Sequence, residues 1–192
     1  MAKSRQFRPC AFAPYNHLDH LPRGVVVHDV SSYADHPYCT LSPMWVHGGI
    51  PVPGMQGVTS DSVEGIWQGL KVIRGKTAPH LFEGPGRKRG GGKPSGHQFG
   101  NKLLGIVEAR RKIYCVAYEW VLANRIDPAL LEQFVARAFE GVSQFFHDTG
   151  DNGDINNTNE PLAHASVLVQ YLNRLCAARI DLPPAGPRRA RT

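Results

Sequence analysis

The chain has 192 residues, of which 42% are hydrophobic and 20% charged, a composition typical of one folded domain. This composition excludes a chain that is disordered over most of its length, and the length excludes two full catalytic domains. No run of about 18 apolar residues occurs and no secretory signal begins the chain, so we expect a cytoplasmic protein with no membrane association.

The formal net charge is +6, and the positive charge is concentrated in one part of the chain. Of the 22 lysine and arginine residues, 11 fall between Lys71 and Lys112, where Glu83 and Glu108 are the only acids. Such a segment attracts phosphate, whether from a nucleic acid backbone or from a nucleotide. A merely solvated basic loop is the alternative interpretation.

The predicted elements describe an α+β fold that is mostly helical, with a few short strands in the N-terminal half. Residues 1–15 are predicted to be a flexible segment and residues 182–192 a disordered basic tail, which leaves 16–181 as a single globular domain. β-Branched residues predict a strand over 24–30. The stretch that follows, to residue 57, is rich in Pro, Gly and His and is predicted to be packed loop.

Apolar residues at helical spacing predict a helix over 62–73, with Asp61 and Glu64 three positions apart in a variant of the capping arrangement. Seven glycines between 84 and 100 predict an irregular loop, because glycine leaves the backbone free and gives nothing apolar to bury. Three further helices are predicted, over 103–124, 128–146 and 161–178.

The helix over 62–73 carries a polar stripe that borders its apolar face. Glu64, Gln68 and Lys71 stand at spacings of four and three residues and therefore share one side of the helix. One interpretation is a surface ion pair between Glu64 and Lys71, with no role for Gln68. The other makes the stripe one wall of a pocket, in which partial burial tunes the pKa of Glu64 for catalysis.

Arg110 falls near the centre of the apolar face of the helix over 103–124. A guanidinium is costly to bury alone, so Arg110 must meet a carboxylate, carbonyl oxygens or a bound anion. A structural ion pair and an anion site both remain open.

The glycine-rich loop carries Arg87, Lys93 and His97 but has neither a Walker motif nor G-x-G-x-x-G after a strand. Closely spaced N–H groups with basic side chains can still bind phosphate, so these three residues are candidates for substrate binding.

The polar loop over 148–159 contains three aspartates that suggest calcium, but glycine occupies the third position from Asp148 and from Asp151, which an EF-hand does not allow. We instead expect the loop to supply a catalytic carboxylate, with Asp151 and Asp154 as candidates and Asp148 as an open alternative. The nine histidines and four cysteines have no diagnostic metal spacing, so no metal and no cofactor is expected.

The order of the motifs SVEGIWQGLKVI, a basic glycine loop, EARRKIYCVAYEW and an Asp-rich loop before a final apolar helix distantly resembles the NADAR superfamily of N-glycosidases. Glu64, Trp67, Gln68 and Lys71 match the pattern of the family's first helix, whereas Gly65 stands where the family usually has histidine. A family of uncharacterised bacterial and phage proteins resembles the chain more closely and implies no activity.

The NADAR resemblance implies a NADAR-like domain that cleaves the N-glycosidic bond of a phosphorylated ribosyl compound, such as a nucleotide or an ADP-ribosylated base. Glu64 and an aspartate would stabilise positive charge on the sugar. Phosphate would contact Lys71, Arg110 and the basic loop, and Trp67, Tyr114 or Trp120 would stack on the base. The rival hypothesis is a non-catalytic protein that binds nucleic acid through the basic loop. The substrate and the oligomeric state remain open.

Overall fold

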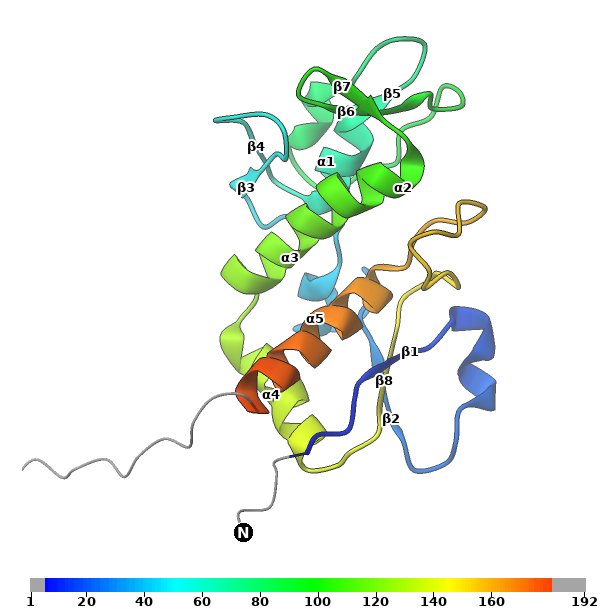
Figure 1. The fold of residues 1–192 in the computed structure, drawn as a ribbon, viewed down its shortest axis with the longest axis vertical. Helices are drawn as coiled ribbons and strands as arrows, with labels where there is room; N and C mark the ends of the chain where they lie inside the picture. The colour runs from blue at the N-terminus through cyan, green and yellow to red at the C-terminus, as the bar shows by residue number, and fades with distance from the viewer. Residues whose placement is uncertain (1–5, 181–192) are drawn as a thin grey trace, which may run out of the picture.

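The computed structural model describes residues 6–180, and one end of the molecule is built on three parallel strands (Figure 1). Strand β8 (Gln144–His147) lies between β1 (Ala11–Phe12) and β2 (Val26–Asp29), with parallel pairing on both sides. The strand predicted over 24–30 is confirmed as β2. The prediction of a flexible segment is wrong at residues 11 and 12, because their pairing with β8 holds them in the sheet. Residues 1–5 and the predicted tail at 182–192 lie outside the described residues.

Two helices pack beside this sheet. Helix α4 (Pro128–Phe139) begins at Asp127, whose carboxylate accepts a hydrogen bond from the N–H of Ala129 at 2.9 Å. The predicted extension to residue 146 is wrong, because Gly141 adopts a positive φ of 80° and the chain then enters β8. Helix α5 (His164–Ile180) begins three residues later than predicted and contacts α4, β1 and β8.

The other end of the molecule carries α1 (Val63–Leu70) on a small antiparallel sheet, with the hairpin β3 (Ile50–Pro51) and β4 (Thr59–Ser60) beside it (Figure 1). This sheet consists of three short strands in the order β5 (Lys71–Val72), β6 (Gly96–Phe99) and β7 (Lys102–Leu104).

Helix α1 differs from its prediction at both ends. Ser62, rather than Asp61, caps it, since the Ser62 hydroxyl accepts from the N–H of Gly65 at 3.1 Å. The helix ends at Leu70 because Lys71 turns to extended backbone and pairs with His97 of β6. The same pairing makes residues 96–99 a strand, so the prediction of irregular structure is wrong for these residues. Over 84–95 the chain is irregular apart from short turns, as predicted.

A continuous helical run connects the two ends of the molecule (Figure 1). It comprises α2 (Ile106–Ala109), a π-helical turn over Arg110–Tyr114, and α3 (Cys115–Asn124). It starts later than predicted because residues 102–104 form β7. The core extends along this run, with Ile113, Tyr118 and Val121 fully buried, and the predicted single, mostly helical α+β domain is confirmed.

Among residues 6–180, none of the helices combines the length and the apolar composition that crossing a membrane requires.

Candidate active site

The polar stripe of α1 is a buried chain of hydrogen bonds. Gln68 donates from Nε2 to Oε1 of Glu64 at 2.5 Å, and the ammonium of Lys71 donates to Oε1 of Gln68 at 2.7 Å. Glu64 is 8% exposed and Gln68 is 4% exposed, so the interpretation as a solvated surface pair is wrong. We call Glu64, Trp67, Gln68 and Lys71 the α1 cluster.

Burial shifts the protonation of Glu64. Desolvation raises its pKa above the ordinary value, and the hydrogen bond from Gln68 with the charges of Lys71, Lys88 and His164 only partly offsets it. Gly86 packs directly against the Glu64 side chain, where a larger residue would clash. The shift is in the direction that favours a proton on Glu64, which is the direction that general acid–base chemistry by a carboxyl group requires.

An aromatic series adjoins the α1 cluster. The Trp67 ring stacks on His97 with a centroid distance of 3.8 Å and meets Tyr114 edge-on at 5.5 Å. Three predicted binding residues on three different elements are thus brought together. Trp120 is not among them, because it lies further along α3 and its ring packs under the guanidinium of Arg125 at 5.1 Å.

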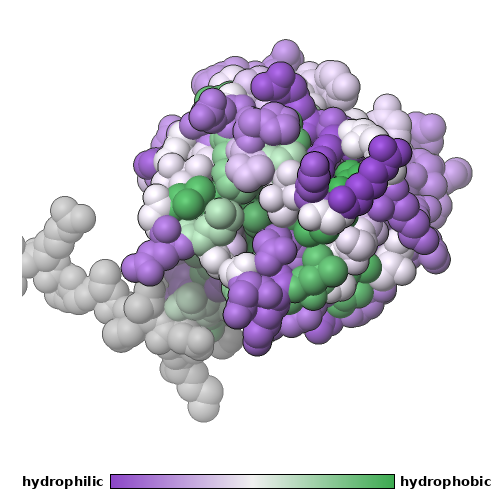
Figure 2. Space-filling model, turned by 90° about the horizontal axis from the view of Figure 1, so that it is seen from above, coloured by the Kyte–Doolittle hydropathy of each residue, from purple (hydrophilic) through white to green (hydrophobic). Residues whose placement is uncertain are grey.

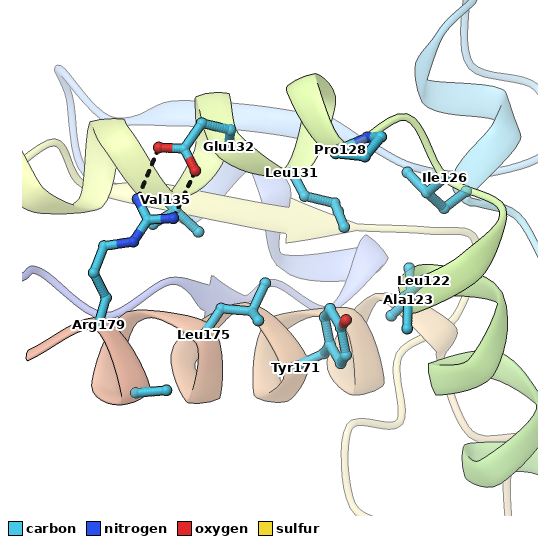
Figure 3. A pocket seen from close by; sticks show the side chains of 11 residues that line it. Leu122, Ala123, Ile126, Pro128, Leu131, Glu132, Val135, Tyr171, Leu175 and Arg179 are labelled. Carbon is cyan, nitrogen blue, oxygen red and sulfur yellow. Dashed lines mark hydrogen bonds and ion pairs between the residues drawn. The ribbon is translucent and has the colours of Figure 1, made fainter. Parts of the chain in front are cut away.

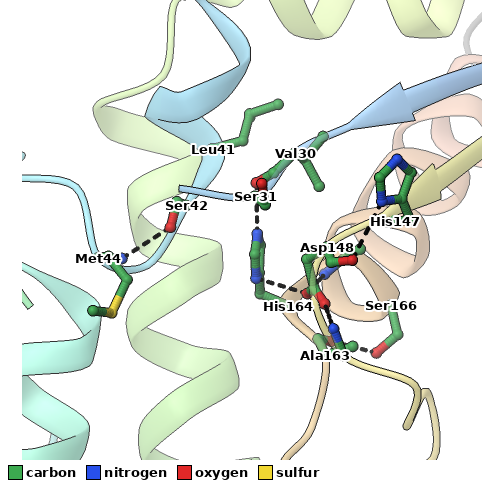
Figure 4. Close-up of polar contacts among 12 residues, drawn as sticks. Val30, Ser31, Leu41, Ser42, Met44, His147, Asp148, Ala163, His164 and Ser166 are labelled. Atoms are coloured by element: carbon green, nitrogen blue, oxygen red, sulfur yellow. Dashed lines mark hydrogen bonds and ion pairs between the residues drawn. The ribbon is translucent and has the colours of Figure 1, made fainter. Parts of the chain in front are cut away.

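The carboxyl ends of β2 and β8 meet the start of α5 at a buried polar contact between Asp148 and His164 (Figure 4). The Nδ1 atom of His164 lies 2.7 Å from Oδ2 of Asp148, and Nε2 lies 2.8 Å from the carbonyl oxygen of Val30. Oxygen atoms of two other elements thus lie within hydrogen-bonding distance of the two ring nitrogen atoms and fix the orientation of the imidazole. We call this arrangement the Asp148–His164 pair.

The Asp148–His164 pair is connected to Glu64 by charge and by aromatic packing. The Tyr118 ring lies between His164 and Tyr114, with centroid distances of 5.8 and 6.4 Å. Burial raises the pKa of Tyr114 well above its ordinary value, and the negative charges of Glu64 and Asp148 add to the effect. Sequence reasoning missed His164, because its contacts are 16 and 134 residues away and a lone histidine at a helix start carries no distinctive spacing.

Asp151 and Asp154 do not join this group. The carboxylate of Asp151 is exposed and accepts from the N–H of Asn16, and that of Asp154 accepts from the backbone and side chain of Asn156. Neither carboxylate contacts α1 in the part of the chain that is described. Of the three candidate aspartates, only Asp148 lies near the aromatic series.

Arg110 is buried, as its position on the apolar face predicts, with 3% of its surface exposed. Its guanidinium donates to the carbonyl oxygens of Ile155, Asn157 and Glu160 at 2.5 to 2.9 Å. The sequence left three kinds of partner open, namely a carboxylate, carbonyl oxygens and a bound anion, and the structure shows carbonyl oxygens. Three of the five guanidinium N–H donors are used in this way, so Arg110 holds the 155–160 loop against the helical run.

One family model matches the chain over residues 13–168, which include the α1 cluster and the Asp148–His164 pair. The chain belongs to DUF6939, a family of unknown function. No curated protein and no solved structure matches the chain significantly. The family match therefore covers both polar centres.

Basic side chains stand at the edge of the α1 cluster. Arg89 is held in place by hydrogen bonds. Its backbone N–H donates to Oε1 of Gln68, and its guanidinium donates to the carbonyl oxygens of Lys71 and Lys76. Arg87, Lys88 and Lys93 are exposed and form no ion pair among residues 6–180. Hydrophilic side chains accordingly cover much of this end of the DUF6939 chain, with apolar ones between them (Figure 2).

A separate groove lies between α4 and α5 (Figure 3). It has a volume of about 380 Å³, is lined mainly by aliphatic side chains such as Leu131 and Leu175, and is crossed by the ion pair of Glu132 with Arg179. No residue of the α1 cluster lines it. Within the described part of the DUF6939 chain, no three histidine, cysteine or acidic side chains are grouped so that they could hold a metal ion.

Proposed function

We propose that this protein is a hydrolase, an N-glycosidase that cleaves the N-glycosidic bond of a phosphorylated ribosyl compound such as a nucleotide or an ADP-ribosylated base. The observation that carries the proposal is the buried carboxylate of Glu64, held by Gln68 and bordered by Lys71 and the Trp67 ring. The resemblance of this helix to the NADAR pattern supports the same assignment.

The chemistry needs one well-placed carboxylate. Breaking the bond between C1 of the sugar and the nitrogen of the base builds positive charge on the sugar, which a nearby carboxylate stabilises. Gln68 fixes Oε1 of Glu64, and no hydrogen bond to Oε2 occurs among the described residues. Oε2 is therefore the atom that faces C1 or orients the attacking water.

Phosphate binding falls to Lys71 and the exposed basic side chains beside it. Burial lowers the pKa of Lys71, and the positive charges of Lys88 and Arg89 lower it further, against the opposing effect of Glu64. An anion placed among these groups relieves the mutual repulsion of their charges. Trp67, which is only partly buried, supplies the flat apolar surface that a base requires, and the buried Tyr114 supports it edge-on.

The proposed reaction uses water and neither metal nor cofactor, and it takes place in the cytoplasm. We expect the purified protein to release free base from at least one compound in a panel of ribosyl phosphates linked through nitrogen, including ADP-ribosylated guanine. Chromatography of the released base measures the activity. EDTA should leave the rate unchanged, and a rate that EDTA abolishes and zinc restores would contradict the proposed mechanism.

The exposed side chains of Arg87, Lys88 and Lys93 favour one second candidate, a non-catalytic protein that binds nucleic acid. If a few phosphate contacts carry the binding, affinity for a short duplex should fall roughly 100-fold between about 50 and 200 mM salt. Fluorescence anisotropy of a labelled oligonucleotide measures it. Salt-insensitive binding, or binding that survives replacement of Arg87 and Lys93 by alanine, would exclude this role for the basic loop.

A further inference from the structure

His97 is a buried polar side chain whose hydrogen-bonding capacity is unused. It is 2% exposed, and neither Nδ1 nor Nε2 has a hydrogen-bond partner in the described structure. A buried polar atom without a partner costs stability, and native proteins keep few of them. The other three buried histidines each have a partner: His28 contacts Gln144, His147 contacts the carbonyl oxygen of Asp148, and His164 contacts Asp148 and Val30.

The two unpartnered nitrogen atoms of His97 belong to a ring that lies beside the α1 cluster. His97 pairs with Lys71 across β5 and β6, and Trp67 stacks on its ring. Burial, followed by the charge of Lys71, lowers the pKa of His97 to about 4. The ring is therefore neutral near pH 7 and offers one N–H donor and one bare acceptor.

The Trp67 indole is the more exposed of the two stacked rings. It is only partly buried, whereas the imidazole beneath it is closed off. Rotation of the indole toward solvent would uncover His97 next to Lys71, where the proposed substrate binds. The two nitrogen atoms flank Cε1 and point in different directions, so one ligand group satisfies one of them and water that enters with the ligand satisfies the other.

We propose that His97 recognises the base of the substrate, a nitrogen heterocycle with a polar edge, by hydrogen bonding to that edge after Trp67 turns aside. This inference rests on the proposed function for the location of the ligand. It makes His97 a specificity-determining residue, which keeps an unsatisfied side chain in the free protein in order to bind the base.

The test replaces His97 by phenylalanine, which keeps a flat ring under Trp67 and removes both nitrogen atoms. Because the unsatisfied atoms disappear, the ligand-free melting temperature should stay the same or rise by about 2–4 °C. Affinity for guanosine 5′-monophosphate should fall about tenfold or more, while affinity for ribose 5-phosphate stays the same. Isothermal titration calorimetry measures both ligands. The matched control is His28→Phe, which should lower the melting temperature because it leaves Gln144 Oε1 without its partner.

Equal loss of affinity for both ligands, no loss for either, or failure of the wild type to bind the nucleotide at millimolar concentration would overturn the proposal. If His97→Phe does not fold, the ¹⁵N shifts of the His97 ring in the wild type decide, since they must move on saturation with the nucleotide. Bond cleavage is not measured in these experiments. Binding that depends on His97 in a protein that releases no base would leave this proposal standing and remove the N-glycosidase assignment.

Discussion

Replacement of Glu64 by glutamine should reduce base release by about 10²- to 10⁴-fold, the range expected when a group that acts in proton transfer or charge stabilisation is lost. Glutamine has nearly the same shape, and its oxygen can still accept the hydrogen bond from Gln68. It cannot carry the negative charge that stabilises the cation forming at C1. The rate of base release on the substrate identified for the wild type measures the effect.

The same variant should fold at least as well as the wild type. Burial raises the pKa of Glu64 in the folded state, so ionisation of Glu64 destabilises the fold as the pH rises from the unfolded pKa through the folded pKa. Glutamine removes this penalty at pH 7, and its advantage should vanish in acid below the unfolded pKa. Thermal unfolding at the two pH values measures the difference.

Glu108→Gln is the matched control, because Glu108 is half exposed and pairs with Lys112 on the surface of α2. It should keep the wild-type rate. Unchanged activity of Glu64→Gln, or an equal loss in Glu108→Gln, would contradict the proposed role of Glu64.

Local sequence patterns predicted where helices occur better than they predicted the residues at which the helices end. The apolar spacing around Ile66 and the cap at Asp127 depend on neighbours in the sequence, and both place a helix correctly. The end of α1 at Leu70 and the strand at 144–147 depend on pairing with residues far along the chain. Because β8 pairs with strands more than 100 residues earlier, no local pattern distinguishes it from a continuation of α4.

The same distinction applies to the site. The spacing of Glu64, Gln68 and Lys71 predicted a connected stripe, since residues three and four apart on a helix are neighbours. The burial of Arg110 also followed from helical periodicity, although its choice of carbonyl oxygens as partners did not. His164 could not be predicted, because its function depends on where β2, β8 and α5 meet in space.

Replacement of His164 by alanine should destabilise the fold by about 3–5 kcal/mol, because it removes the side-chain partner of the buried Asp148 carboxylate and leaves its partners unsatisfied. Asp148 would keep only the N–H groups of Gly150 and Ala165, and the carbonyl oxygen of Val30 would lose its donor. For a domain of this size the melting temperature should fall by roughly 6–20 °C. Calorimetry or circular dichroism measures the shift. His80→Ala, at an exposed position, is the control and should change stability by less than about 0.5 kcal/mol.

The effect of His164→Ala should depend on pH in a defined direction. Burial alone would raise the pKa of Asp148, but the hydrogen bond and charge of His164, together with the N–H groups of Ala165 and Gly150, outweigh it and lower that pKa. A lowered pKa gives stability that is present above the unfolded pKa and lost as the pH falls through the folded pKa. The difference between wild type and variant should therefore shrink on acidification below about pH 4. A difference that stayed constant down to about pH 2 would show that Asp148 draws no stability from His164 and that the ring acts only by packing.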